Sequence, residues 1–86
     1  MKHLASPAYW YHYRSLPEEV QALADKNFTI LKADPRHPSL RLKKIGEFWT
    51  VRVGLRYRAI AIAQDESLVW IWVGSHDDYD ALLKAR

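Results

Sequence analysis

Residues 48–73, FWTVRVGLRYRAIAIAQDESLVWIWV, decide the fold, because apolar blocks and turn residues alternate along this stretch. The first block alternates with the period of two that a half-buried strand produces. Gly54 opens a predicted tight reversal, and the two later blocks are apolar on both sides, which is typical of central strands. The stretch therefore predicts an antiparallel meander, with strands over residues 48–53, 57–63 and 68–73.

Two helical patterns precede this stretch. Ser6 and Pro7 have the order of an N-cap and a first helical residue, and they predict a short aromatic helix over residues 7–15. Ser15 and Glu18 have the spacing of a capping box and stand before a longer amphipathic segment. The second helix should end before the Asp-Pro step that opens the next loop, because proline disfavours a helical residue before it.

The order of these elements predicts an α+β fold in two layers. Two N-terminal helices pack on a three- to four-stranded antiparallel sheet, and a short C-terminal helix follows over residues 76–83. The helices need one face of the sheet, so the other face is expected to stay partly open. With 86 residues, the chain is expected to form a single domain over residues 1–86.

Composition excludes several classes of protein. There is no cysteine, so a disulfide framework, a thiolate nucleophile and a zinc ribbon are all impossible. No apolar run approaches the roughly 20 residues of a membrane span, and residues 1–7 lack the apolar core of a signal peptide. The histidines are too scattered for a metal site. We therefore expect a cytoplasmic protein without a metal or another cofactor.

The positive charge is concentrated in the middle of the chain. Residues 36–58 hold seven basic residues and one acidic residue, a net charge of +6, whereas residues 1–35 are neutral and residues 59–86 carry −3. Such a concentration is typical of a surface that binds a polyanion, nucleic acid first and an acidic protein second. A solvated basic surface that only maintains solubility is the alternative. The residues predicted to contact RNA are Arg41, Lys43, Lys44 and Arg56.

Four further residues are candidates for chemistry. Arg52 and Arg58 interrupt apolar strands, where a charge is costly unless it is solvated or paired. His76 follows the last strand directly, and Tyr79 would share a helix face with it. Arginines can bind a phosphodiester, a histidine can move protons, and a tyrosine can stack on a base. Structural roles compete with each assignment: an ion pair for either arginine, a structural histidine, and a packing tyrosine.

The order and spacing of three segments resemble the RelE/ParE superfamily of bacterial toxin–antitoxin toxins, and most of all its RelE/HigB-like translational repressors. The segments are LPEEVQALADKNFTILKADPRHPSLRLKKI, WTVRVGLRYRAIAI and VWIWVGSHDDYD. The resemblance covers nearly the whole chain. It implies a small α+β fold with helices on one face and, in many members, metal-independent cleavage of mRNA in the ribosomal A site.

The resemblance also implies roles for single residues. Arg52 would contact the scissile phosphate, and Arg58 would stabilise the transition state. His76 would protonate the leaving oxygen, and Tyr79 would stack on an mRNA base. The implied partners are a cognate antitoxin, mRNA and the ribosome.

Some features depart from the family pattern and leave alternatives open. The N-terminal strand common in the family is expected to be short or missing, and Thr50 stands where some nucleases have a second basic residue. ParE-type members keep the fold, lack the nuclease residues and inhibit DNA gyrase. The alternatives to a ribonuclease are therefore a ParE-like gyrase inhibitor, or a non-catalytic module that binds nucleic acid or an antitoxin.

Overall fold

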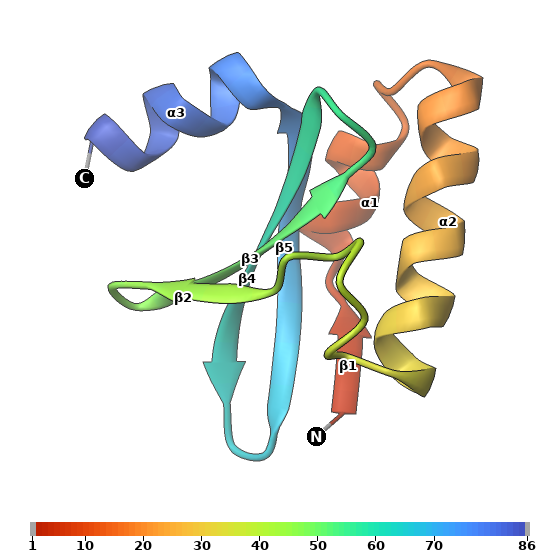
Figure 1. Ribbon diagram of the computed structural model, residues 1–86. Helices are drawn as coiled ribbons and strands as arrows, with labels where there is room; N and C mark the ends of the chain where they lie inside the picture. Colours follow the sequence, from red (N-terminus) through yellow and green to blue (C-terminus); the bar gives the residue numbers. More distant parts are fainter. Residues whose placement is uncertain (1, 86) are drawn as a thin grey trace.

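The computed structural model describes residues 2–85, which form three helices and one five-stranded sheet (Figure 1). The strand order in the sheet is β1-β5-β4-β3-β2. None of the helices in the described range is long and apolar enough to cross a membrane. In chain order the elements are β1 (Lys2–Ala5), α1 (Pro7–Tyr13), α2 (Glu18–Ala33), β2 (Lys43–Ile45), β3 (Phe48–Val53), β4 (Tyr57–Gln64), β5 (Ser67–Ser75) and α3 (His76–Ala85).

The predicted α+β class, the meander of β3, β4 and β5, and the three helices are confirmed. The predicted strand count and the purely antiparallel pairing are wrong. A short β2 pairs antiparallel with β3, and β1 pairs parallel with the other edge of the sheet, on β5. The family's N-terminal strand is therefore present in this chain, although it has only four residues.

The N-terminal strand, expected to be short or missing, is present as the short β1, and its side chains do not follow the usual pattern. Leu4 is 51% exposed, whereas His3, its polar neighbour, is 7% exposed. His3 is held inside by a hydrogen bond that the indole Nε1 of Trp70 donates to its Nδ1 at 3.1 Å. The backbone N–H of Ser6 then donates to the carbonyl of Trp70 at 3.0 Å and ends the pairing. Four residues and one buried histidine leave no periodic signal in the sequence.

The N-terminal cap of α1 was predicted correctly, and the cap of α2 was not. The Oγ of Ser6 accepts a hydrogen bond from the N–H of Tyr9, with proline at the first helical position. In α2, Pro17 is the N-cap and makes no side-chain capping bond, so the predicted capping box of Ser15 and Glu18 is wrong. The backbone N–H of Ser15 donates instead to the carbonyl of His12, which ties Ser15 to the end of α1.

The main core lies between the sheet and the layer formed by α1 and α2 (Figure 1). A register shift between Ile60 and Ala61 of β4 leaves one extra residue, Ile71, in β5. Such a bulge lets Trp70 and Val73, three residues apart, both face the helices. The buried core residues are Tyr9, Leu16, Val20, Ala24, Leu31, Leu40, Val51, Val53, Ala59, Ala61, Leu68, Trp70 and Val73.

The other face of the sheet is only partly open, as predicted. Figure 1 shows α3 on the side of the sheet away from α1 and α2. On this face Thr50 of β3 and Ile60 of β4 lie opposite each other and are 2% and 5% exposed. Tyr79 of α3 is buried as well. We call the remainder of this face, where β3 continues from Thr50 toward the β3–β4 turn, the free face.

Candidate functional site

Arg52 of β3 and Arg58 of β4 lie directly opposite each other in the sheet register, and Arg58 also lies opposite Gly74 of β5. Residues directly opposed in antiparallel strands project to the same face, and successive residues alternate between faces. Because Val51 and Val53 face the helices, the register directs both arginines to the free face, and Arg52 also lines a cavity with Asn27 of α2 and Gly54. The register therefore brings together two arginines whose shared face the sequence left undetermined.

Backbone carbonyls hold the two guanidinium groups. The Nε of Arg52 donates to the carbonyl of Gly54 at 3.1 Å, and the Nη1 of Arg58 donates to the carbonyl of Tyr57 at 2.8 Å. Neither guanidinium pairs with a carboxylate among residues 2–85. Both arginines are half-buried, and most of their N–H groups stay available to a ligand.

This pair of arginines costs stability. Two like charges directly opposite each other across a strand pair are unfavourable, and partial burial reduces the screening by water. An anion between them would remove the repulsion and accept bidentate hydrogen bonds from both groups. The pair therefore has the chemistry of a phosphate site.

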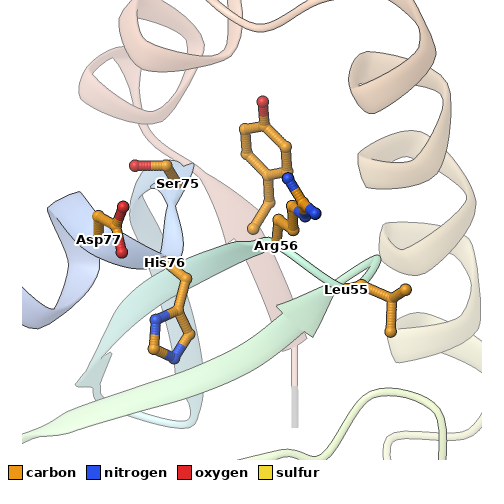
Figure 2. Close-up of a pocket in the computed structure, with 6 residues that line it drawn as sticks. Leu55, Arg56, Ser75, His76 and Asp77 are labelled. Atoms are coloured by element: carbon orange, nitrogen blue, oxygen red, sulfur yellow. The ribbon is translucent and has the colours of Figure 1, made fainter.

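His76 comes two residues after Gly74, the residue of β5 that lies opposite Arg58. Its backbone N–H donates to the carbonyl of Arg56 at 2.7 Å, which continues the β4–β5 ladder beyond the pairing of Arg58 with Gly74. Figure 2 shows the imidazole of His76 pointing away from Ser75 and from the guanidinium of Arg56. The ring is therefore a neighbour of the Arg58 position, at the first residue of α3.

A carboxylate orients the imidazole of His76. Its Nδ1 lies 3.2 Å from a carboxylate oxygen of Asp80, four residues later on α3, and the two side chains are 44% and 45% exposed. With Nδ1 directed at Asp80, Nε2 is the ring nitrogen that a substrate can reach. No partner of Nε2 is present among the described residues. The arrangement suits a group that gives or takes a proton.

Tyr79 lies close to His76 but is buried. The ring centroids of Tyr79 and His76 are 5.9 Å apart at an interplanar angle of 47°. Tyr79 is 6% exposed, so almost none of its ring is available to stack on a base in this conformation. Its placement is that of a residue that packs α3 against the sheet.

The predicted RNA-binding residues are not all on one face. Lys43 of β2 lies opposite Thr50, so it projects to the same face as Arg52, whereas Lys44 lies opposite Trp49 and projects to the other face. Arg41 is exposed in the loop before β2, in a left-handed backbone conformation with φ of 49°. Arg56, in the turn between β3 and β4, is exposed and lines a cavity with His76.

One comparison with known proteins places the chain in a family. A family model described as a ParE-like toxin domain matches residues 20–81, which is most of the sequence. This chain belongs to the ParE-like toxin domain family. It is thereby a toxin of the RelE/ParE superfamily of toxin–antitoxin systems, as the sequence predicted. A search of curated protein sequences found no match.

Solved structures of several RelE/ParE toxins share the fold. The RelB–RelE antitoxin–toxin complex from Methanococcus jannaschii matches with a TM-score of 0.71 at 16% identity, over 91% of this chain and 96% of that chain. YafQ from E. coli strain BL21(DE3) gives 0.71 at 10% identity, over the same shares of the two chains. The isolated E. coli RelE toxin gives 0.62 at 16% identity, over 99% and 98%. At these identities the likeness concerns the fold of this ParE-like toxin alone.

The sequence analysis of this ParE-like toxin did not identify Asp80 as the partner of His76. Asp77 and Asp78 lie in the first turn of α3, where a helix N-terminus favours negative charge. Asp80 instead contacts His76. The signal was present in the sequence, because residues four apart on a helix are neighbours.

Proposed function

We propose that this toxin is a metal-independent mRNA endoribonuclease that acts on ribosome-bound message and so inhibits translation. The observation that supports this most is the placement of Arg52 directly opposite Arg58 on the free face, without a carboxylate partner among residues 2–85. A repulsive pair of half-buried cations is explained by an anionic ligand, and a phosphodiester has the matching geometry.

The proposed reaction is an internal displacement at phosphorus. The 2′-oxygen of the ribose attacks the adjacent phosphate, its proton leaves to solvent, and the bond from phosphorus to the 5′-oxygen breaks. Arg52 holds the phosphate, and Arg58 stabilises the extra negative charge of the pentacovalent transition state. His76 gives a proton from Nε2 to the leaving 5′-oxygen while Asp80 holds Nδ1. The products are a 2′,3′-cyclic phosphate and a free 5′-hydroxyl.

The remaining predicted residues act on binding. Lys43, on the same face as Arg52, extends the cationic surface toward the neighbouring phosphates, and Arg41, Lys44 and Arg56 add long-range attraction. Tyr79 reaches a base only if α3 moves away from the sheet, because its ring is buried in this conformation.

The test is inhibition of translation in a cell-free system by purified variants. His76→Ala and Arg58→Ala are expected to lose at least a hundredfold in inhibitory potency, because each removes a group that acts in the transition state. Arg14→Gln, an exposed cation at the end of α1, is the matched control and should inhibit as wild type does. If His76→Ala and Arg58→Ala both inhibit as strongly as wild type, the catalytic assignment is wrong.

The ParE-like family model favours a second candidate, a gyrase inhibitor without nuclease activity. In that case the basic surface contacts an enzyme instead of RNA, and His76→Ala has little effect. A DNA supercoiling assay with purified gyrase separates the two candidates. Inhibition of supercoiling by wild type and by His76→Ala alike would favour the gyrase candidate.

We also propose an antitoxin as the partner of this chain. The solved complexes from Methanococcus jannaschii and Pyrococcus horikoshii pair a RelE toxin with RelB. In this chain the net charge of +6 over residues 36–58 is complementary to an acidic segment. Co-purification with the product of the adjacent reading frame tests this proposal.

A further inference from the structure

A cavity that Arg52 lines has no role in the proposed cleavage. It has a volume of about 450 Å³ and lies between α2, the loop that leads to β2 and the β3–β4 turn (Figure 1). We call it the α2 cavity. The lining residues that matter for its chemistry are Leu23, Lys26, Asn27, Ile30, Arg52 and Leu55.

Hydrogen bonds at Arg52 join the three segments that form the α2 cavity. The backbone N–H of Arg52 donates to the carbonyl of Leu40 at 2.7 Å, and the side-chain amide of Asn27 donates to the carbonyl of Arg52 at 2.6 Å. The Nε of Arg52 donates to the carbonyl of Gly54 at 3.1 Å. The α2 cavity is therefore formed by the fold itself, as most ligand sites are.

Apolar side chains from two of these segments form one wall of the α2 cavity. Leu23 of α2 is 39% exposed, and Leu55 of the β3–β4 turn is 78% exposed. Ile30, two turns along α2 from Leu23, is half-buried beside them. Covering such exposed apolar surface is favourable, so a ligand of this cavity should carry an aliphatic group.

The charged groups of the α2 cavity are cationic. Lys26 is exposed, and neither Lys26 nor Arg52 pairs with a carboxylate among residues 2–85. With Nε directed at Gly54, the two Nη groups of Arg52 stay available as donors. A carboxylate accepts bidentate hydrogen bonds from such a group and is attracted by a nearby ammonium.

We propose that the α2 cavity docks an extended segment of a partner protein in which an aliphatic residue stands next to an aspartate or a glutamate, and that docking inhibits the toxin. The aliphatic side chain packs on Leu23 and Leu55, and the carboxylate binds Lys26 and Arg52. The inhibition rests on the proposed ribonuclease function, because Arg52 also holds the scissile phosphate there. One guanidinium cannot serve both anions fully, so the segment and the RNA weaken each other's binding by the same factor.

The first experiment measures docking without RNA. The probe is the peptide acetyl-Ala-Leu-Glu-Leu-Glu-Ala-amide, and its counterpart has glutamine in place of both glutamates. The glutamate peptide is expected to shift the amide NMR signals of residues 23–30 and 52–55 in wild type. The glutamine peptide should bind at least about tenfold more weakly, the usual effect of losing a hydrogen bond between charged groups.

Three variants place the peptide in the α2 cavity. Lys26→Gln and Leu55→Ser should each bind the glutamate peptide several-fold to about tenfold more weakly, because they remove the charge and the apolar wall. Lys32→Gln is the matched control, since Lys32 is exposed on the same helix but lies outside the cavity, and it should bind as wild type does. Equal binding of the two peptides, or unchanged binding by Lys26→Gln, would overturn the docking site. Self-association of wild type that Leu55→Ser abolishes would assign the cavity to a second copy of the chain and overturn it as well.

The second experiment adds the glutamate peptide to the cleavage of a ribosome-bound message. It is expected to raise KM in wild type and to have a several-fold smaller effect on Lys26→Gln, which should cleave as wild type does without peptide. A peptide that binds wild type and leaves cleavage unchanged would overturn the inhibition. If wild type does not cleave, the ribonuclease is wrong, and the peptide titration alone then decides whether the docking site exists.

Discussion

At the scale of single residues, the Arg52–Arg58 pair opposes stability and serves the proposed activity. Arg58→Gln removes one of two like charges that face each other across β3 and β4. We expect its free energy of unfolding to rise by up to about 1 kcal/mol, while cleavage falls at least a hundredfold. Urea unfolding and a cleavage assay on the same preparation measure the two effects. A loss of stability together with activity would mean that Arg58 is a structural residue.

His3 gives the stability of the fold a dependence on pH. Burial, with the charge of Lys32 adding to it, lowers the pKa of His3 below the ordinary 6.5. The imidazolium has no acceptor nitrogen, so protonation also leaves the indole N–H of Trp70 without its partner. Because the folded pKa lies below the unfolded value, stability is full above about pH 6.5 and decreases as the pH falls through the folded pKa.

The variant His3→Gln isolates this contribution. A glutamine offers a carbonyl acceptor at every pH, so the difference in unfolding free energy between wild type and variant should shift in the variant's favour between pH 7 and pH 5. Urea titrations at several pH values measure it. A difference that does not change with pH would show that His3 does not titrate with unfolding.

Gly74 lies opposite Arg58 in the sheet and is closely packed against the indole of Trp72. A Cβ at Gly74 would overlap the Cζ2 of the Trp72 indole. Gly74→Ala must therefore displace the indole beside the position of Arg58. We expect a loss of about 1–3 kcal/mol in unfolding free energy, the usual range for overpacking, measured by urea unfolding. A neutral effect would show that Trp72 rotates freely.

At the scale of elements, the cap of α1 illustrates what sequence can and cannot predict. The Oγ of Ser6 accepts from Tyr9 and donates to the carbonyl of Trp70 at 2.9 Å, so it fixes both the helix and β5. Ser6→Ala should cost about 1–2 kcal/mol, and Ser15→Ala, at the site of the wrongly predicted capping box, should stay within about 0.5 kcal/mol. Thermal unfolding compares the two. Equal losses would mean that Ser15 also caps a helix.

Variants of Tyr79 distinguish a role in packing α3 against the sheet from a role in stacking on a base. Tyr79 is 6% exposed, so Tyr79→Ala should lose about 3 kcal/mol of unfolding free energy, as aromatic truncations in a core do. Tyr79→Phe keeps the ring and should stay within about 0.5 kcal/mol. Urea unfolding measures both. Tyr79→Ala with unchanged stability and lost activity would instead favour a role in base stacking.

At the scale of the whole molecule, periodicity predicted the meander and the extents of α2 and α3 well, because these segments carry their own signal. It did not predict β1, whose pairing depends on the contact of His3 with Trp70, 67 residues away. Nor did it predict the face shared by Arg52 and Arg58, since sheet register is a tertiary property. The distribution of charge along the sequence located the basic region, but only the sheet register shows that Lys43 and Lys44 project to opposite faces.

The measurement that most directly tests the central claim uses one message with a single 2′-deoxynucleotide at a mapped cleavage site. Wild-type toxin is added to ribosomes that translate this message or its all-ribose twin, and primer extension maps the new 5′ ends. The account predicts a cut in the all-ribose message and none at the deoxy position, with other sites cut equally. Cleavage at the deoxy position, or inhibition of translation without any cut, would contradict it.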